Sequence, residues 1–218
     1  MQNIIFGIIS FLIADFSFGF GAIKLFKKKI PLYLQMIVCA AGCFAIEQLS
    51  YVVNLWCGVA VEPSVGMFGI FGCNFFLLSA NFGTLDRIVD DGNGSKTARR
   101  VAIIAPAILA VLDVIAFLSW KDRSMLSAVI WFIMLLPALP ASYFNLKHIL
   151  LPVDPFEILK ATRNCNISAL VFYAVTAAFV ISSASFNYTA GGIFSILMSL
   201  SVMGLSLCAV KGAKKWGI

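Results

Sequence analysis

Seven apolar runs follow one another along this chain, and each is about as long as a helix that crosses a bilayer. Such a helix needs about 20 apolar residues, because lipid offers its backbone no other hydrogen-bond partners. The runs predict seven transmembrane helices, at residues 4–26, 32–56, 67–85, 101–120, 125–146, 166–185 and 193–210. We therefore expect an all-α integral membrane protein in which residues 1–218 form a single seven-helix transmembrane domain.

The composition agrees with a chain whose solvent is lipid. Hydrophobic residues make up 61% and charged residues only 12% of the chain, whereas a soluble domain carries about 25% charged residues. The net charge of +6 comes from basic residues in the connections, a distribution typical of membrane orientation rather than of nucleic-acid binding. The expected partner is the lipid bilayer, and no nucleic-acid partner is expected.

The basic residues lie almost entirely on one side of this predicted topology. If the N-terminus is outside, all but two of the 16 Lys and Arg residues fall on the inner side, the exceptions being Lys121 and Arg123. Cytoplasmic loops of membrane proteins are enriched in Lys and Arg. The sequence therefore predicts a multi-pass protein of the plasma (inner) membrane with its N-terminus outside and its C-terminus inside.

The second apolar run, residues 36–55, contains a carboxylate, Glu47, near its middle. Ionisable residues inside a membrane span usually face the bundle interior or a cavity, and they commonly mark functional sites. Helical spacing places Glu47 on one stripe with Tyr51 and Asn54. This stripe is the first candidate for a ligand or ion site.

Three further polar residues lie at a comparable depth in other spans: Asp15 in the first, Asn74 in the third and Asp113 in the fourth. Counted at 1.5 Å per residue, all four lie about 10 to 17 Å from the outer surface. No Lys, Arg or His lies in a span interior to neutralise the acids. The acids are expected either to be protonated or to hold a cation. The alternative is that each only locks helices together.

Hydroxyl groups of the last two spans form a second polar group, made up of Tyr173, Thr176, Ser195 and Ser199. If they face Glu47, they complete a hydrogen-bonding pocket. The alternative is that each hydroxyl bonds to the backbone of its own helix.

Small residues and prolines predict how the spans pack. Gly66, Gly69 and Gly72 are spaced so that another helix can approach the third span closely. Pro137 and Pro140 are expected to kink the fifth span and free backbone carbonyls, or else simply to bend it around its neighbours.

The chain has no recognisable catalytic, metal or cofactor motif, so we expect neither an enzyme nor a cofactor. The six cysteines show no CxxC spacing, and the one histidine, His148, is expected at the inner interface. The acidic stretch from Asp86 to Gly94 lacks the second Asp-rich motif of membrane prenyltransferases and the closing Glu of an EF-hand.

Two functions are compatible with an acidic and polar pocket in the outer half of such a bundle. The first is a small transporter or channel that depends on protons or on another cation. The alternative is a seven-helix receptor or sensor that binds a small molecule in the same pocket and signals through its basic inner loops. The predicted ligand is a small molecule or a cation in both cases, and the oligomeric state is left open.

Overall fold

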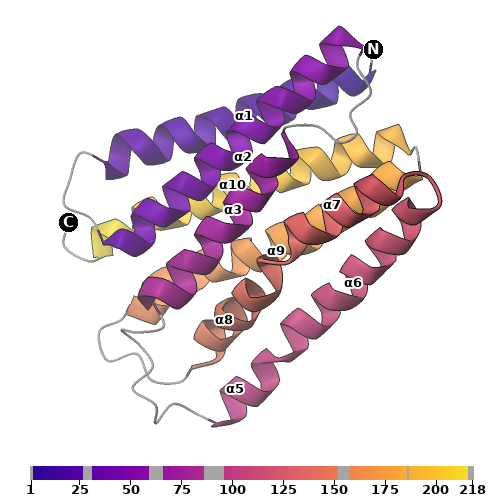
Figure 1. The fold of residues 1–218 in the computed structure, drawn as a ribbon. Coiled ribbons are helices and arrows are strands. Elements are labelled where there is room, and N and C mark those ends of the chain that lie inside the picture. Colours follow the sequence, from indigo (N-terminus) through magenta and orange to yellow (C-terminus); the bar gives the residue numbers. More distant parts are fainter. Residues whose placement is uncertain are drawn as a thin grey trace.

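A computed structural model describes residues 2–26, 31–58, 66–85, 96–151, 158–185 and 187–215 of the chain (Figure 1). The regular structure of these residues is entirely helical. The helices are α1 (Gln2–Leu25), α2 (Leu32–Cys57), α3 (Met67–Leu78), the π-helical segment η1 (Ser79–Leu85), α5 (Lys96–Ala102), α6 (Ile104–Lys121), α7 (Met125–Leu135), α8 (Ala138–Leu150), α9 (Ile158–Ala184) and α10 (Tyr188–Lys215).

These helices form the seven predicted apolar spans. Six spans are long and apolar enough to cross a membrane, and two of them are helix pairs, α5 with α6 and α7 with α8. The seventh is the shorter apolar stretch Met67–Phe82, made by α3 and the start of η1. The prediction of a helical multi-pass membrane protein is therefore confirmed, and the count of seven helices fits. The acidic stretch after η1 lies outside the described residues.

The bundle has two sides that meet along α3, α9 and α10. Helix α1 lies at one edge, where it packs against α2 and α10, and α6 lies at the opposite edge against α7, α8 and α9 (Figure 1). Helix α3 packs against α2 on one side and against α7 and α8 on the other. Residues far apart in the sequence, such as those of α1 and α10, are consequently direct neighbours.

A proline explains the break in one of the two spans that consist of helix pairs. Between α7 and α8, the N–H of Leu136 bonds to the carbonyl of Ile133 at 3.3 Å, which is a tighter turn than that of an α-helix. Pro137 follows and has no N–H to donate, so the helix is interrupted there. The predicted disturbance of the fifth span is confirmed at Pro137, whereas Pro140 lies in the first turn of α8.

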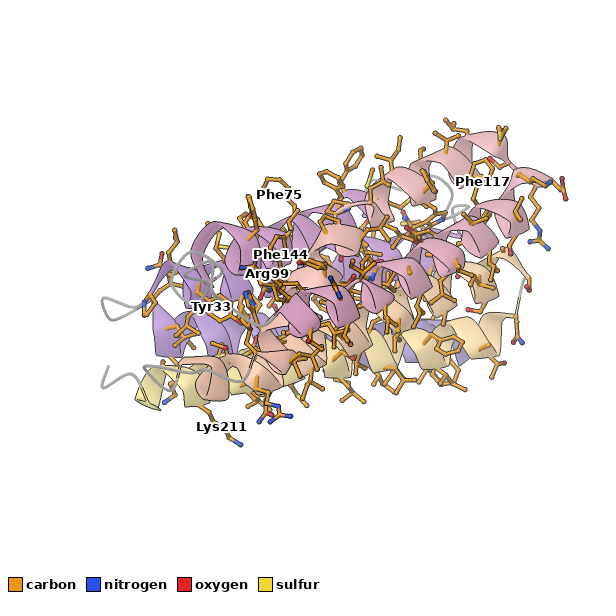
Figure 2. The ribbon with its side chains drawn as sticks, turned by 90° about the horizontal axis from the view of Figure 1, so that it is seen from below. Tyr33, Phe75, Arg99, Phe117, Phe144 and Lys211 are labelled. Carbon is orange, nitrogen blue, oxygen red and sulfur yellow. The ribbon has the colours of Figure 1, made fainter. Side chains whose placement is uncertain are left out.

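Side chains at the surface are mostly apolar along the middle of the bundle. Phe16, Phe68 and Ile108 are more than half exposed, as expected for residues that face lipid acyl chains. Arg99 and Lys211 lie in the half of the bundle that contains Tyr33, and Phe117 lies in the other half (Figure 2). Which of the two ends faces the cytoplasm remains a prediction from the basic residues.

Candidate functional site

Glu47 lies on the buried face of α2, and its side chain is only 5% exposed. The amide nitrogen Nε2 of Gln48, itself 1% exposed, donates a hydrogen bond to Glu47 Oε2 at 2.5 Å. In the described part of the chain this is the only hydrogen bond of the Glu47 carboxyl group, and no basic side chain contacts it. The acid therefore lies in the interior, as predicted, and its partner there is a neutral amide.

A line of hydroxyl groups continues from Gln48 across two other helices. The hydroxyl of Ser195 on α10 donates to Gln48 Oε1 at 3.1 Å. Ser10 on α1 donates to the carbonyl of Ser195 at 2.8 Å, and its Oγ lies 2.6 Å from that of Ser199. We call these five residues (Glu47, Gln48, Ser195, Ser10 and Ser199) the polar chain. It joins α2, α10 and α1 in the core, where none of its members is more than 5% exposed.

The polar chain ends at the carboxyl group of Glu47. Ser10 and Ser199 share a hydrogen bond in which either hydroxyl can be the donor. Ser195 in turn donates to Gln48, and Gln48 donates to the carboxyl group. Glu47 thus accepts at the end of the chain, where a group with negative charge is best placed to accept.

Glycines of α3 bring the backbone of that helix against α2 beside Glu47. A Cβ atom built on Gly69 would lie 2.5 Å from the carbonyl oxygen of Cys43 and 2.6 Å from Cβ of Glu47. A Cβ atom on Gly72 would lie 2.9 Å from Sγ of Cys43, and one on Gly66 would lie 2.8 Å from Cβ of Ser50. The predicted close approach at these three glycines is confirmed, and it holds Glu47 directly against α3.

Aromatic contacts between α2 and α9 occur on both sides of Glu47 along α2. The rings of Phe44 and Phe172 lie 5.4 Å apart, and those of Tyr51 and Phe179 lie 6.3 Å apart, both edge to face. Glu47 is three residues after Phe44 and four residues before Tyr51. Glu47 therefore lies between two aromatic pairs along α2, one on each side.

The other predicted polar residues of the core are bonded elsewhere. Thr176 donates to the carbonyl of Phe172 in its own helix at 2.7 Å, so the backbone alternative holds for this residue. Tyr173 accepts from Asn145 Nδ2 at 3.3 Å. Asn74 Nδ2 donates to the carbonyl of Met134 at 3.2 Å, close to the break between α7 and α8.

The remaining residues of the predicted site are separated from the polar chain in the structure. Asp15 is exposed on the surface of α1, so it does not join Glu47. Asp113 is 4% exposed on α6, and its Oδ2 atom has no hydrogen-bond partner. Asn54 lies near the end of α2, where its backbone carbonyl accepts the N–H of Gly58. Thus the hydrogen bonds of the structure link Glu47 to serines rather than to Asp15, Asn74 or Asp113.

Two features of the interior were not predicted. Ser10 was not among the predicted site residues, although Ser10 and Ser17 recur at a spacing of seven, which places them on one helix face. His148 was expected at the interface, but it is only 1% exposed, and its Nδ1 lies 3.2 Å from Oδ1 of Asn81. A histidine beside a lysine in sequence gives no sign that it will turn inward.

No family model matches this chain, and neither the curated proteins nor the solved structures include a significant match. In the described part of the chain, no group of three or more His, Cys, Asp or Glu side chains is placed to hold a metal ion. The fold and the site together define a multi-pass membrane protein, built as a helical bundle that buries an acid among neutral polar groups.

Proposed function

We propose that the chain is a small transporter or channel of the plasma (inner) membrane that depends on protons, and that Glu47 is its protonation site. The observation that carries this proposal is the buried carboxyl group of Glu47, which has a neutral amide as its only partner. A buried carboxylate without a positive partner is costly. A proton or a bound cation must therefore offset its charge for part of the working cycle.

The partners of Glu47 favour a proton over a metal cation. Calcium and magnesium are bound by six or more oxygen ligands, and other hard cations likewise prefer oxygen. Gln48 presents the donor group Nε2 to the carboxylate, and an N–H donor repels a cation. A proton needs only one oxygen, and Glu47 Oε1 has no hydrogen bond in the described part of the chain.

A change in protonation would act on the helices through the polar chain. A deprotonated Glu47 accepts the N–H of Gln48, whereas a protonated Glu47 also becomes a donor and prefers a different set of partners. Because Gln48 is bonded to Ser195, and Ser195 to Ser10, the altered preference reaches α10 and α1. Such a link between protonation and helix position is what an alternating-access transporter needs.

Proton movement in reconstituted vesicles tests this proposal. The purified protein is placed in liposomes that contain a trapped pH-sensitive dye, a pH gradient is imposed, and the membrane potential is clamped with potassium and valinomycin. We expect proton flux above that of protein-free vesicles, and we expect Glu47→Gln to reduce it at least tenfold. Asp15→Asn is the matched control, since it makes the same acid-to-amide change at an exposed position, and it should leave the flux unchanged.

Two results would count against the proposal. If Glu47→Gln conducts as well as the native protein, Glu47 is not the protonation site. If the native protein moves no more protons than empty vesicles do, the proton-dependent function is wrong. Small molecules that raise the thermal midpoint of the native protein would then support the receptor or sensor function.

A further inference from the structure

Asp15 occupies an unusual place for a charged residue in a membrane protein. It lies near the middle of α1, about 15 Å from the C-terminal end of this helix at 1.5 Å per residue. Its side chain is exposed, and its neighbours Leu12 and Phe16 are 58% and 59% exposed. The carboxyl group therefore lies on a surface whose other side chains face the hydrocarbon core.

Lipid does not satisfy such a group. An acid at the centre of a membrane helix is costly, and acids in spans normally face a protein partner or a water-filled cavity. In the described part of the chain, no side chain bonds to Asp15, whereas buried Ser10 and Ser17 on another face of α1 each bond to α10. The described part of the bundle therefore supplies no partner for Asp15.

Gly19, one turn beyond Asp15, provides a second and independent sign of a contact surface. A Cβ atom built on Gly19 would have no other atom within 4 Å. The other glycines of α1 differ, because Cβ atoms on Gly7 and Gly21 would lie 3.2 Å from Leu55 and Val38 of α2. A small residue beside a polar one on an open helix face is the pattern at which membrane helices approach each other closely.

The position of α1 in the fold leaves this face accessible. Helix α1 lies at the edge of the bundle and packs against α2 and α10, so its remaining surface is turned away from the other helices (Figure 1). A second protein can therefore reach Asp15 and Gly19 without any change in the bundle itself.

We propose that the face of α1 that contains Asp15 and Gly19 binds a second copy of this chain, with the two α1 helices side by side about a two-fold axis normal to the membrane. In such a dimer the same residue of each copy meets at the same depth. A carboxyl group is self-complementary, because its O–H donates while its carbonyl oxygen accepts. The two Asp15 side chains thus supply each other with the polar partner that lipid lacks, and Gly19 allows the close approach that this bond requires.

Counting subunits in a bilayer tests this proposal. The full chain carries one fluorophore per copy on a C-terminal tag and is reconstituted over a range of protein-to-lipid ratios, and photobleaching steps are counted. We expect the native protein to be dimeric. Asp15→Leu and Gly19→Leu should each raise the dissociation constant of the dimer at least tenfold, the first by removing the hydrogen bond and the second by keeping the helices apart.

Two further variants serve as controls. Asp15→Asn should retain the dimer, because a carboxamide is also self-complementary. Ala107→Leu introduces the same leucine side chain as Gly19→Leu, but at an exposed position of α6, and it should leave the dimer unchanged. The three positions lie on exposed faces or beside open space, so the thermal midpoint of each detergent-solubilised variant should stay close to that of the native chain.

Two outcomes would overturn the proposal. A native protein that stays monomeric at every ratio would show that a second copy does not cover this face, and it would point to a different membrane protein with a Lys or Arg at the depth of Asp15. A native dimer that is equally stable in Asp15→Leu and Gly19→Leu would place the interface elsewhere on the bundle.

Discussion

Glu47 and Asp113 are both carboxyl groups buried in the same bundle, yet their surroundings differ. Glu47 accepts an N–H from Gln48 and ends a chain of hydrogen bonds that reaches α1. Asp113 is buried to a similar degree, but its Oδ2 atom has no hydrogen-bond partner in the described structure. Two acids that are buried to the same degree can therefore have different surroundings. The difference between these two lies in whether the fold supplies a donor to the carboxyl group.

The contacts of α1 and α3 beside Glu47 use smaller residues than the contacts of α6 beside Asp113, although aromatic pairs between α2 and α9 also flank Glu47. On the side of Glu47, helices approach through glycines and serines, such as Gly69 of α3 and Ser17 of α1. On the side of Asp113, large rings fill the contacts: Trp120 of α6 donates to the carbonyl of Val180, and the rings of Phe117 and Phe132 lie 6.0 Å apart. Small residues leave room for a polar chain, whereas rings exclude water and offer few donors.

The largest effect is expected from pushing α3 away from Glu47. Gly69→Ala would place a methyl group 2.5 Å from a backbone oxygen of α2, which cannot rotate aside. We expect the free energy of unfolding, measured by titration with SDS in mixed micelles, to fall by about 2 kcal/mol or more. Proton flux should fall as well, because Glu47 shifts together with α2.

Two other glycines calibrate this result. A methyl group at Gly192 would lie 2.5 Å from the ring of Phe6, which is a side chain and can turn, so Gly192→Ala should cost less. Gly191→Ala should have little effect, because its nearest neighbours would be hydroxyl oxygens at 3.8 and 3.9 Å. Equal losses at Gly69 and Gly191 would mean that the contact between α2 and α3 is looser than described.

The free energy of unfolding should respond differently when the carboxyl group is removed from each of the two acids. Glu47→Met keeps the length of the side chain but leaves the Gln48 amide buried without its acceptor, so a loss of about 1 kcal/mol is expected. Asp113→Val removes a carboxyl group to which no described residue donates a hydrogen bond. The free energy of unfolding should therefore stay constant or rise by about 1 kcal/mol. SDS titration of both variants beside the native protein measures the difference. A loss at Asp113 as large as at Glu47 would mean that Asp113 has a partner in the membrane.

More of the fold than of the candidate site could be predicted from the sequence. The seven spans could be predicted because each needs about 20 apolar residues, and the close approach at Gly69 followed from glycine spacing. Glu47 could be predicted because an acid inside an apolar run needs a partner. Its actual partners could not, since Ser10 and Ser195 are 185 residues apart and meet only because α1 packs against α10.

The positions of Asp15 and Asp113 show the same limit. Depth along a span follows from counting residues, and it placed these acids in one slab of the membrane with Glu47. The direction in which a side chain points depends on which neighbours the helix acquires, and a single sequence does not contain that information. Asp15 lies on the face that α2 and α10 leave uncovered, and Asp113 lies on the half of the bundle opposite to α1.

The smallest expected effect comes from two serines of α1 that make similar contacts at different depths. Ser10 bonds to Ser195 and Ser199 of α10, and Ser17 bonds to the carbonyl of Val202 at 3.1 Å and lies 2.9 Å from the hydroxyl of Ser206. Ser10→Ala and Ser17→Ala should each lower the free energy of unfolding by about 0.6 kcal/mol, the average for a hydrogen bond between membrane helices. SDS titration measures both losses.

Proton flux should separate these two serines, although stability does not. Only Ser10 is connected to Glu47 by hydrogen bonds, through Ser195 and Gln48. Ser10→Ala should therefore slow proton movement in vesicles, whereas Ser17→Ala should leave it unchanged. If both variants slow it equally, the serines act only by holding α1 against α10. If neither does, the polar chain is a structural contact that takes no part in proton movement.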